Sequence, residues 1–164
     1  MGFNSFLASH LRVAIVWISA ALLMSLAGGA HAAGIASIVH ARKAHFKTLG
    51  RTDRFLRDDL HRSPPHWHRI QVHAKQIALL AKELPTWFPA GSGQGHHVDT
   101  EASRAIWEKP AAFARVAQRM TISADKITRD ADDHNLNALA FDARRLGQSC
   151  ASCHRAFRTR YHWW

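Results

Sequence analysis

The sequence is poor in cysteine, with two among its 164 residues, Cys150 and Cys153, three positions apart near the end of the chain. It shows no strand-like alternation of apolar and polar residues, no internal repeat, and no low-complexity segment beyond one glycine-rich loop. Its first 32 positions contain no acidic residue. The lack of alternation and of repeats disfavours a β-structure or a repeat protein, and leaves the two cysteines as the most informative feature.

The first 32 residues have the composition of a secretory signal peptide. Arg12 precedes an apolar stretch from Val13 to Leu26, and the small-residue triplet Ala30-His31-Ala32 follows. The stretch is shorter than the roughly 20 residues that span a membrane. We therefore expect a signal peptide at 1–32, cleavage after Ala32, export to the periplasm, and one compact domain at 33–164.

The chain is strongly basic, with a formal net charge of +10. A basic protein outside the cytoplasm rarely meets nucleic acid, so we expect no nucleic-acid partner. The charge is expected either to keep the protein soluble or to attract acidic protein surfaces or anionic membrane.

Large apolar residues recur every three or four positions in four segments, as in amphipathic helices. The expected helix starts are near Ile35, at Ser63-Pro64-Pro65, at Pro110 and at Leu136, which is the first residue on the apolar face of the last helix. The expected apolar face of the third helix consists of Phe113, Ala117, Met120, Ala124, Ile127 and Ala131. Pro85 ends the second helix, and a long irregular connection follows it. Four helices without strands imply an all-α fold, an antiparallel up-down-up-down four-helix bundle.

Two charged residues fall on the apolar face of the first expected helix. Stepping by threes and fours from Ile35 places Arg42 and Asp53 on that face. Burying the charge of Arg42 in a core costs free energy unless an anion pairs with it there.

The last helix carries the sequence C-A-S-C-H. At about 100° per residue, the side chains of Cys150, Cys153, His154, Phe157 and Arg158 fall within an arc of roughly 140°. C-x-x-C-H is the attachment sequence of c-type haem, in which the thiols bind the vinyl groups and the imidazole binds the iron. We therefore expect one covalent haem c, with Cys150 and Cys153 as thioether residues and His154 as axial ligand.

Two other interpretations of the cysteine pair remain open. A thiol oxidoreductase would place the pair at a helix start after a strand, whereas here it lies late in the last helix. A zinc site would need further ligands, which the many histidines could supply. His66-x-His68 and His96-His97-x-Asp99 could likewise bind copper or zinc, and neither offers a full ligand set.

Four segments of the expected domain form a recognisable set: V-H-A-R-K-A-H-F-K-T-L-G at 39–50, L-P-T-W-F-P-A-G-S at 84–92, A-I-W-E at 105–108 and C-A-S-C-H-R-A-F-R at 150–158. With these segments, nearly all of the expected domain resembles the cytochromes c′. The resemblance implies that Arg42 pairs with a haem propionate, that Phe157 packs on the haem and that Arg158 lies near its proximal side. A guanidinium that forks onto a carboxylate would make the burial of Arg42 tolerable.

The resemblance also points to Phe46 as the residue that faces the iron. The electron carriers of this family have a methionine ligand at the corresponding position, and phenylalanine has no lone pair to donate. Met120 is the one methionine after the signal peptide, and a packing role suits it better than ligation. His45 and His73 could reach the iron if their helices rotated. We therefore expect five-coordinate, mostly high-spin iron under an aromatic ring in the distal pocket.

Such a pocket favours small, nearly neutral ligands. Bound oxygen acquires negative charge and needs a hydrogen-bond donor, whereas nitric oxide and carbon monoxide do not. The first hypothesis is therefore a gas-binding protein. The alternative is a six-coordinate electron-transfer protein with another distal ligand and an acidic redox partner. An enzyme such as a peroxidase would need an acid-base residue over the iron, which Phe46 does not supply. Relatives are often homodimers built through their first two helices.

Overall fold

The computed structural model describes residues 34–93 and 99–159 of the chain. In these residues it contains a first helix over 34–60, then α2 (Trp67–Glu83), the 3-10 turn η1 (Leu84–Trp87), α3 (Ala105–Glu108), α4 (Pro110–Asp132) and α5 (Leu136–Phe157). None of the helices in this part is long and apolar enough to cross a membrane. The expected signal peptide, 1–32, lies outside the described residues and stays a prediction.

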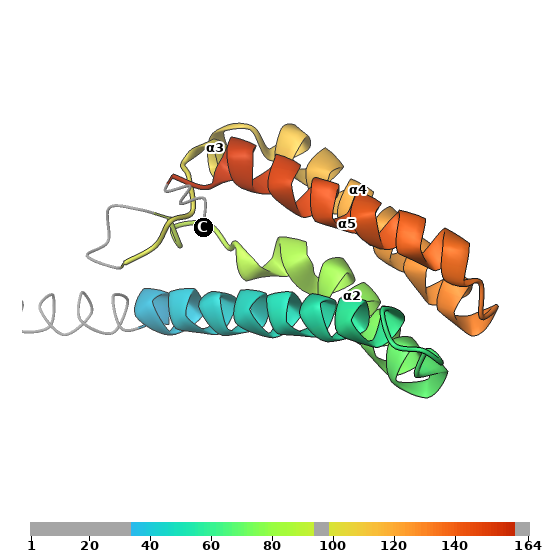
Figure 1. Cartoon of the computed structure of the whole chain (residues 1–164). Helices are drawn as coiled ribbons and strands as arrows, with labels where there is room; N and C mark the ends of the chain where they lie inside the picture. Colours follow the sequence, from blue (N-terminus) through green and yellow to red (C-terminus); the bar gives the residue numbers. More distant parts are fainter. Residues whose placement is uncertain (1–33, 94–98, 160–164) are drawn as a thin grey trace, which may run out of the picture.

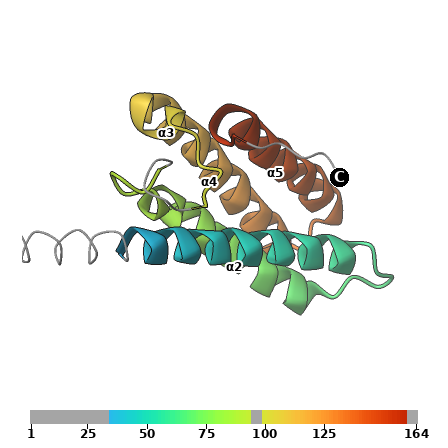
Figure 2. The same ribbon diagram turned by 90° about the vertical axis from the view of Figure 1, so that its left-hand side faces the viewer.

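The long helices form two antiparallel pairs. The first helix, blue to teal, lies beside α2, and α4 lies beside α5 (Figure 1). Contacts between α2 and α4 join the two pairs, and the second view shows the pairs crossing at an angle (Figure 2). The predicted all-α four-helix bundle is confirmed.

The buried faces of the helices are those that the periodicity predicts. In α4 the expected core residues are all buried: Phe113, Ala117, Met120, Ala124, Ile127 and Ala131. On the first helix Arg42 is 4% exposed, so the predicted charge on its core face is confirmed. Burial of these apolar faces supplies the main driving force for the bundle.

Two local predictions are wrong. The second helix begins at Trp67, so Ser63-Pro64-Pro65 lies in the preceding turn. Pro65 biases Pro64 away from the helical conformation, which keeps the helix from starting there. Leu136 was expected on the apolar face of the last helix, but it is 39% exposed because it lies in the first turn, at the end of the bundle.

The connection between α2 and α4 closes one end of the bundle. It contains η1 and the single turn of α3, and Ala102 forms an isolated antiparallel bridge with Arg158. Two backbone hydrogen bonds of 2.9 Å flank that bridge, from Ser103 N to Phe157 O and from Thr159 N to Glu101 O. The segment after the glycine-rich loop is thereby fixed to the end of α5.

Replacing Asn135 by alanine should lower the free energy of unfolding by about 1 kcal/mol. The Asn135 side chain caps α5 by accepting a hydrogen bond from the N–H of Ala138 at 3.1 Å. Asn137→Ala is the control, because Asn137 is exposed inside the first turn and has no capping role. Urea unfolding followed by circular dichroism measures both, and an equal loss in the two variants would contradict the capping role.

Candidate haem site

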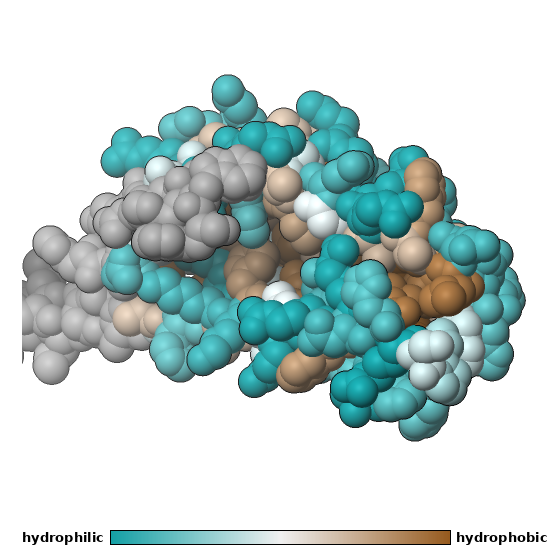
Figure 3. All heavy atoms as spheres, in the orientation of Figure 1, coloured by the Kyte–Doolittle hydropathy of each residue, from teal (hydrophilic) through white to brown (hydrophobic). Residues whose placement is uncertain are grey.

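A cavity of about 500 Å³ lies between the first helix and the end of α5. Its walls are mainly apolar, with Leu49, Leu84 and Ile106 among the lining residues. Hydrophobic side chains are visible in the hollow between the two helix pairs (Figure 3). A cavity of this size and polarity is typical of sites for cofactors and other small molecules.

The structure brings the C-x-x-C-H residues together on the wall of this cavity. Cys150, Cys153 and His154 all line it, and both cysteines are free thiols. The last two helical turns of α5 place the three side chains on one face, as the spacing predicts. Both sulfurs and the imidazole can therefore reach one flat molecule.

The cavity keeps the two thiols protonated. Burial raises the pKa of the Cys150 thiol to about 11, with the Asp53 carboxylate as the next largest cause. Burial also raises the pKa of the Cys153 thiol to about 11, against a lowering effect of Arg119. Reactive redox cysteines have lowered pKa values, so these thiols do not have the properties of a thiol oxidoreductase.

His154 is suited to bind a metal ion. Burial lowers the pKa of its imidazole, and the positive charge of Arg158 lowers it further, while Glu101 acts in the opposite direction. The neutral imidazole has a free lone pair at neutral pH, which is the form that ligates iron.

Phe46 and His154 both line the cavity, and their rings face each other. The ring centroid of Phe46 lies 6.4 Å from that of His154, with an angle of 67° between the ring planes. The Phe46 ring is held from behind by Trp87, at 5.2 Å, and by Phe88, at 6.1 Å, both in edge-on contacts. An aromatic wall without a donor atom therefore stands opposite the imidazole.

The other candidate ligands lie in different places. Met120 lines the cavity from α4 and is 4% exposed. His45 stacks on Trp87 with ring centroids 4.8 Å apart and does not line the cavity. The Nε2 of His73 lies 3.5 Å from a carboxylate oxygen of Asp59, also away from the cavity. Of these three residues, Met120 is the one whose side chain lines the cavity.

Phe157 lines the cavity, and its packing on the haem stays a prediction. It is buried, and its ring makes an edge-on contact with Phe113 at 5.3 Å. The pair forms an apolar wall beside His154.

Arg42 lines the cavity and fixes the loop above it. Its guanidinium donates hydrogen bonds to Ser92 Oγ at 3.0 Å, to Ser92 O at 2.9 Å and to Thr100 Oγ1 at 2.8 Å. It also lies over the Phe88 ring at 4.7 Å. Burial lowers the pKa of Arg42. The oxygen atoms that accept its hydrogen bonds are neutral, so they do not balance the positive charge of the guanidinium. That charge favours an anion, and the propionate contact stays a prediction.

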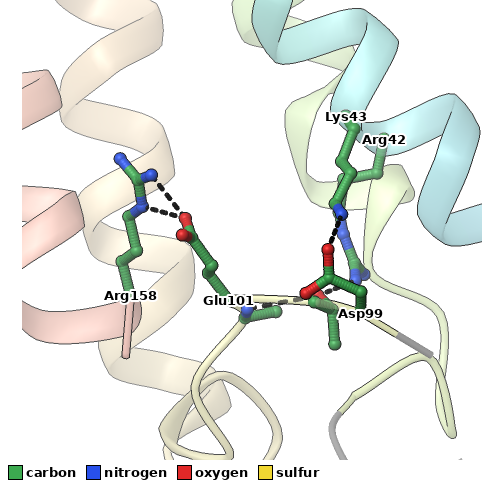
Figure 4. Close-up of polar contacts among 7 residues, drawn as sticks. Arg42, Lys43, Asp99, Glu101 and Arg158 are labelled. Carbon is green, nitrogen blue, oxygen red and sulfur yellow. Dashed lines mark hydrogen bonds and ion pairs between the residues drawn. The ribbon is translucent and has the colours of Figure 1, made fainter. Parts of the chain in front are cut away.

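Arg158 is held by an acidic residue that the sequence analysis did not single out. Its guanidinium pairs with the Glu101 carboxylate, and Lys43 pairs with Asp99 at 2.9 Å (Figure 4). The segment 99–102 thus joins the first helix to the end of α5. Arg158 lines the cavity close to His154, and its place near the proximal side of the haem stays a prediction.

The copper or zinc interpretation gains no support in the described part of the chain. Those residues contain no group of three histidine, cysteine or acidic side chains able to hold a metal ion. His66 Nδ1 lies 3.9 Å from Asp59, beside the guanidinium groups of Arg62 and Arg69, which disfavour a cation. His96 and His97 lie outside the described residues.

Residues 37–158 match the family described as Cytochrome C'. The chain belongs to the cytochrome c′ family. Cytochrome c′ of Rhodospirillum rubrum is 30% identical over 122 residues, which cover 74% of this chain and 77% of that protein. Cytochrome c-554 of Cereibacter sphaeroides is 41% identical over 86 residues, 52% of this chain. The match spans less than two thirds of the two cytochromes c-554, at 64% and 56%.

Solved cytochromes c′ share the fold. A cytochrome c′ with a ligand-controlled dimer dissociation has a TM-score of 0.71 at 16% identity, covering 77% of this chain and 97% of that one. The nitric oxide complex of a variant from Alcaligenes xylosoxidans has a TM-score of 0.68 at 21% identity, covering 76% and 95%.

The residues present fit the haem c that membership of the cytochrome c′ family implies. Two protonated thiols and a neutral imidazole share one wall of an apolar cavity, and the buried Arg42 lies on its lining. Cys150 and Cys153 would hold the group by thioether bonds, and His154 would bind its iron.

Replacing Arg42 by lysine should lower the free energy of unfolding of the haem-loaded protein by about 2 kcal/mol or more. An ammonium group cannot reproduce the forked contacts to Ser92 and Thr100, so buried acceptors lose their donors. The control is Arg51→Lys, an exposed site on the same helix. Urea unfolding of the two variants should differ clearly, and equal midpoints would contradict this role of Arg42.

Proposed function

We propose that this protein is a periplasmic mono-haem cytochrome c′ whose iron is five-coordinate and binds small neutral gases, above all nitric oxide. The observation that carries the proposal is the aromatic wall opposite the predicted ligand, with Phe46 facing His154 at 6.4 Å. The haem supplies an iron atom that binds diatomic ligands, and this chain supplies one imidazole and no donor atom on Phe46.

The cavity lining supports the choice of ligand. Phe46 offers no hydrogen bond to a ligand that gains negative charge, as oxygen does on binding. Nitric oxide and carbon monoxide are nearly neutral and do not depend on such a donor. A variant of the structurally similar cytochrome c′ from Alcaligenes xylosoxidans forms a nitric oxide complex, which supports the same ligand here.

Electron transfer is the second candidate function. The formal charge of +10 would steer an acidic redox partner to the protein. Met120 is a candidate to complete a six-coordinate iron, because its thioether sulfur is a donor and its side chain lines the cavity. The two functions are compatible, and neither requires an acid-base residue for turnover, so we propose no enzymatic activity.

A homodimer through the first two helices is part of the same proposal. Phe55 on the first helix and Val72 and Leu79 on α2 are exposed, at 42%, 49% and 58%. Exposed apolar side chains on adjoining helices favour contact with another protein surface. The related cytochrome c′ with ligand-controlled dimer dissociation supports a second copy as the partner.

The reduced protein should change its Soret band when nitric oxide or carbon monoxide is added, and the oxidised protein should have a high-spin spectrum at neutral pH. We expect both results because Phe46 leaves one side of the iron without a protein ligand. Optical titration under argon measures both. A low-spin spectrum together with no response to either gas would refute the proposal.

Replacing Phe46 by methionine should give a six-coordinate, low-spin protein, because a thioether then faces His154. Its carbon monoxide affinity should fall by about tenfold or more, since the gas must displace the sulfur. Met120→Leu is the matched variant and should keep the native spin state. A change of spin state in Met120→Leu would show instead that Met120 is the distal ligand.

A further inference from the structure

Asp53 brings a negative charge into the lining of the haem cavity. It lies on the first helix about two turns after Phe46, on the face that the periodicity assigns to the core. Its Oδ2 accepts a hydrogen bond from Arg57 Nε at 2.9 Å, while its Oδ1 is buried without a hydrogen-bond partner. Leaving a buried carboxylate oxygen without a donor is costly, so this oxygen needs a physical explanation.

The charge of Asp53 affects the thiol of Cys150, which also lines the cavity. After burial, the Asp53 carboxylate is the largest cause that raises the pKa of the Cys150 thiol, and the opposing effect of Arg57 ranks lower. Arg57 does not line the cavity, because its guanidinium turns to α5, where Nη2 donates to Ala143 O at 2.7 Å. The ion pair therefore presents its negative member to the cavity.

The cavity lining contains five other charged side chains: Arg42, Lys43, Lys47, Glu101 and Arg158. Arg42 is bound by Ser92 and Thr100, and Glu101 is paired with Arg158. Asp53 thus differs from Glu101, because one of its oxygens is buried and has no donor. A charge beside an apolar cavity acts more strongly than one in water, because the surroundings screen it less.

We propose that Asp53 is a specificity-determining residue of the haem cavity, which lowers the reduction potential and disfavours anionic ligands relative to neutral gases. This inference rests on the proposed function and deepens it. Ferric haem carries one more positive charge than ferrous haem, so a nearby carboxylate stabilises the ferric form. The same carboxylate repels an anion that approaches the iron and leaves a neutral gas unaffected.

The test compares two substitutions that remove the same charge from the same helix of the haem-loaded protein. Asp53→Asn removes the cavity carboxylate, and Asp58→Asn removes a neighbouring exposed one. Asp53→Asn should shift the ferric–ferrous equilibrium about tenfold toward the ferrous form, which is about 59 mV for one electron. Azide should bind its ferric form several-fold more tightly, and carbon monoxide should bind its ferrous form as before. Asp58→Asn should resemble the native protein in all three measurements.

Equal shifts in Asp53→Asn and Asp58→Asn would overturn the proposal, because net charge alone would then explain them. Arg57→Gln gives a second test that leaves Asp53 charged and without its partner. It should lower the reduction potential and weaken azide binding, and a change in the other direction would also overturn the proposal. The potential tests Asp53 even if the native iron proves six-coordinate, so this inference and the proposed function can fail separately.

Discussion

The constraint on which this structure depends is an apolar cavity of about 500 Å³ kept open at one end of a four-helix bundle. A mainly apolar cavity of that size, partly open to solvent, leaves apolar side chains in contact with water, and a bound apolar group would remove that contact. The residues of the lining fit a large flat group such as haem in this place. Two thioether bonds from Cys150 and Cys153 would keep that group there permanently.

The charges of the cavity are arranged around this requirement. Arg42 is buried among the neutral oxygens of Ser92 and Thr100, so its positive charge remains available to an anion such as a haem carboxylate. The Asp53 carboxylate raises the pKa of the thiol of Cys150, where a thioether would form. Phe46 lies between Arg42 and Asp53 on the first helix, and its ring faces His154. The cavity lining therefore has a positive and a negative side chain on either side of an apolar surface beside the predicted iron position.

Local patterns in the sequence predict much of this arrangement, because helical spacing fixes which side chains share a face. The common face of Cys150, Cys153 and His154 and the burial of Arg42 follow from such spacing, and the structure confirms both. Contacts made by loops do not follow from spacing. Thr100 lies 58 positions from Arg42, and Glu101 lies 57 positions from Arg158, so no periodic pattern pairs them. The predicted start of the second helix at Ser63-Pro64-Pro65 is wrong, because the rule for prolines in the first turn does not account for a second proline that follows.

Mass spectrometry of the protein, produced together with a cytochrome c maturation system and extracted with acidified acetone to remove unbound haem, tests the central claim most directly. We expect the tryptic peptide that contains Cys150, Cys153 and His154 to keep the mass of one haem. Recovery of that peptide with two free thiols, and of all haem in the extract, would contradict the account.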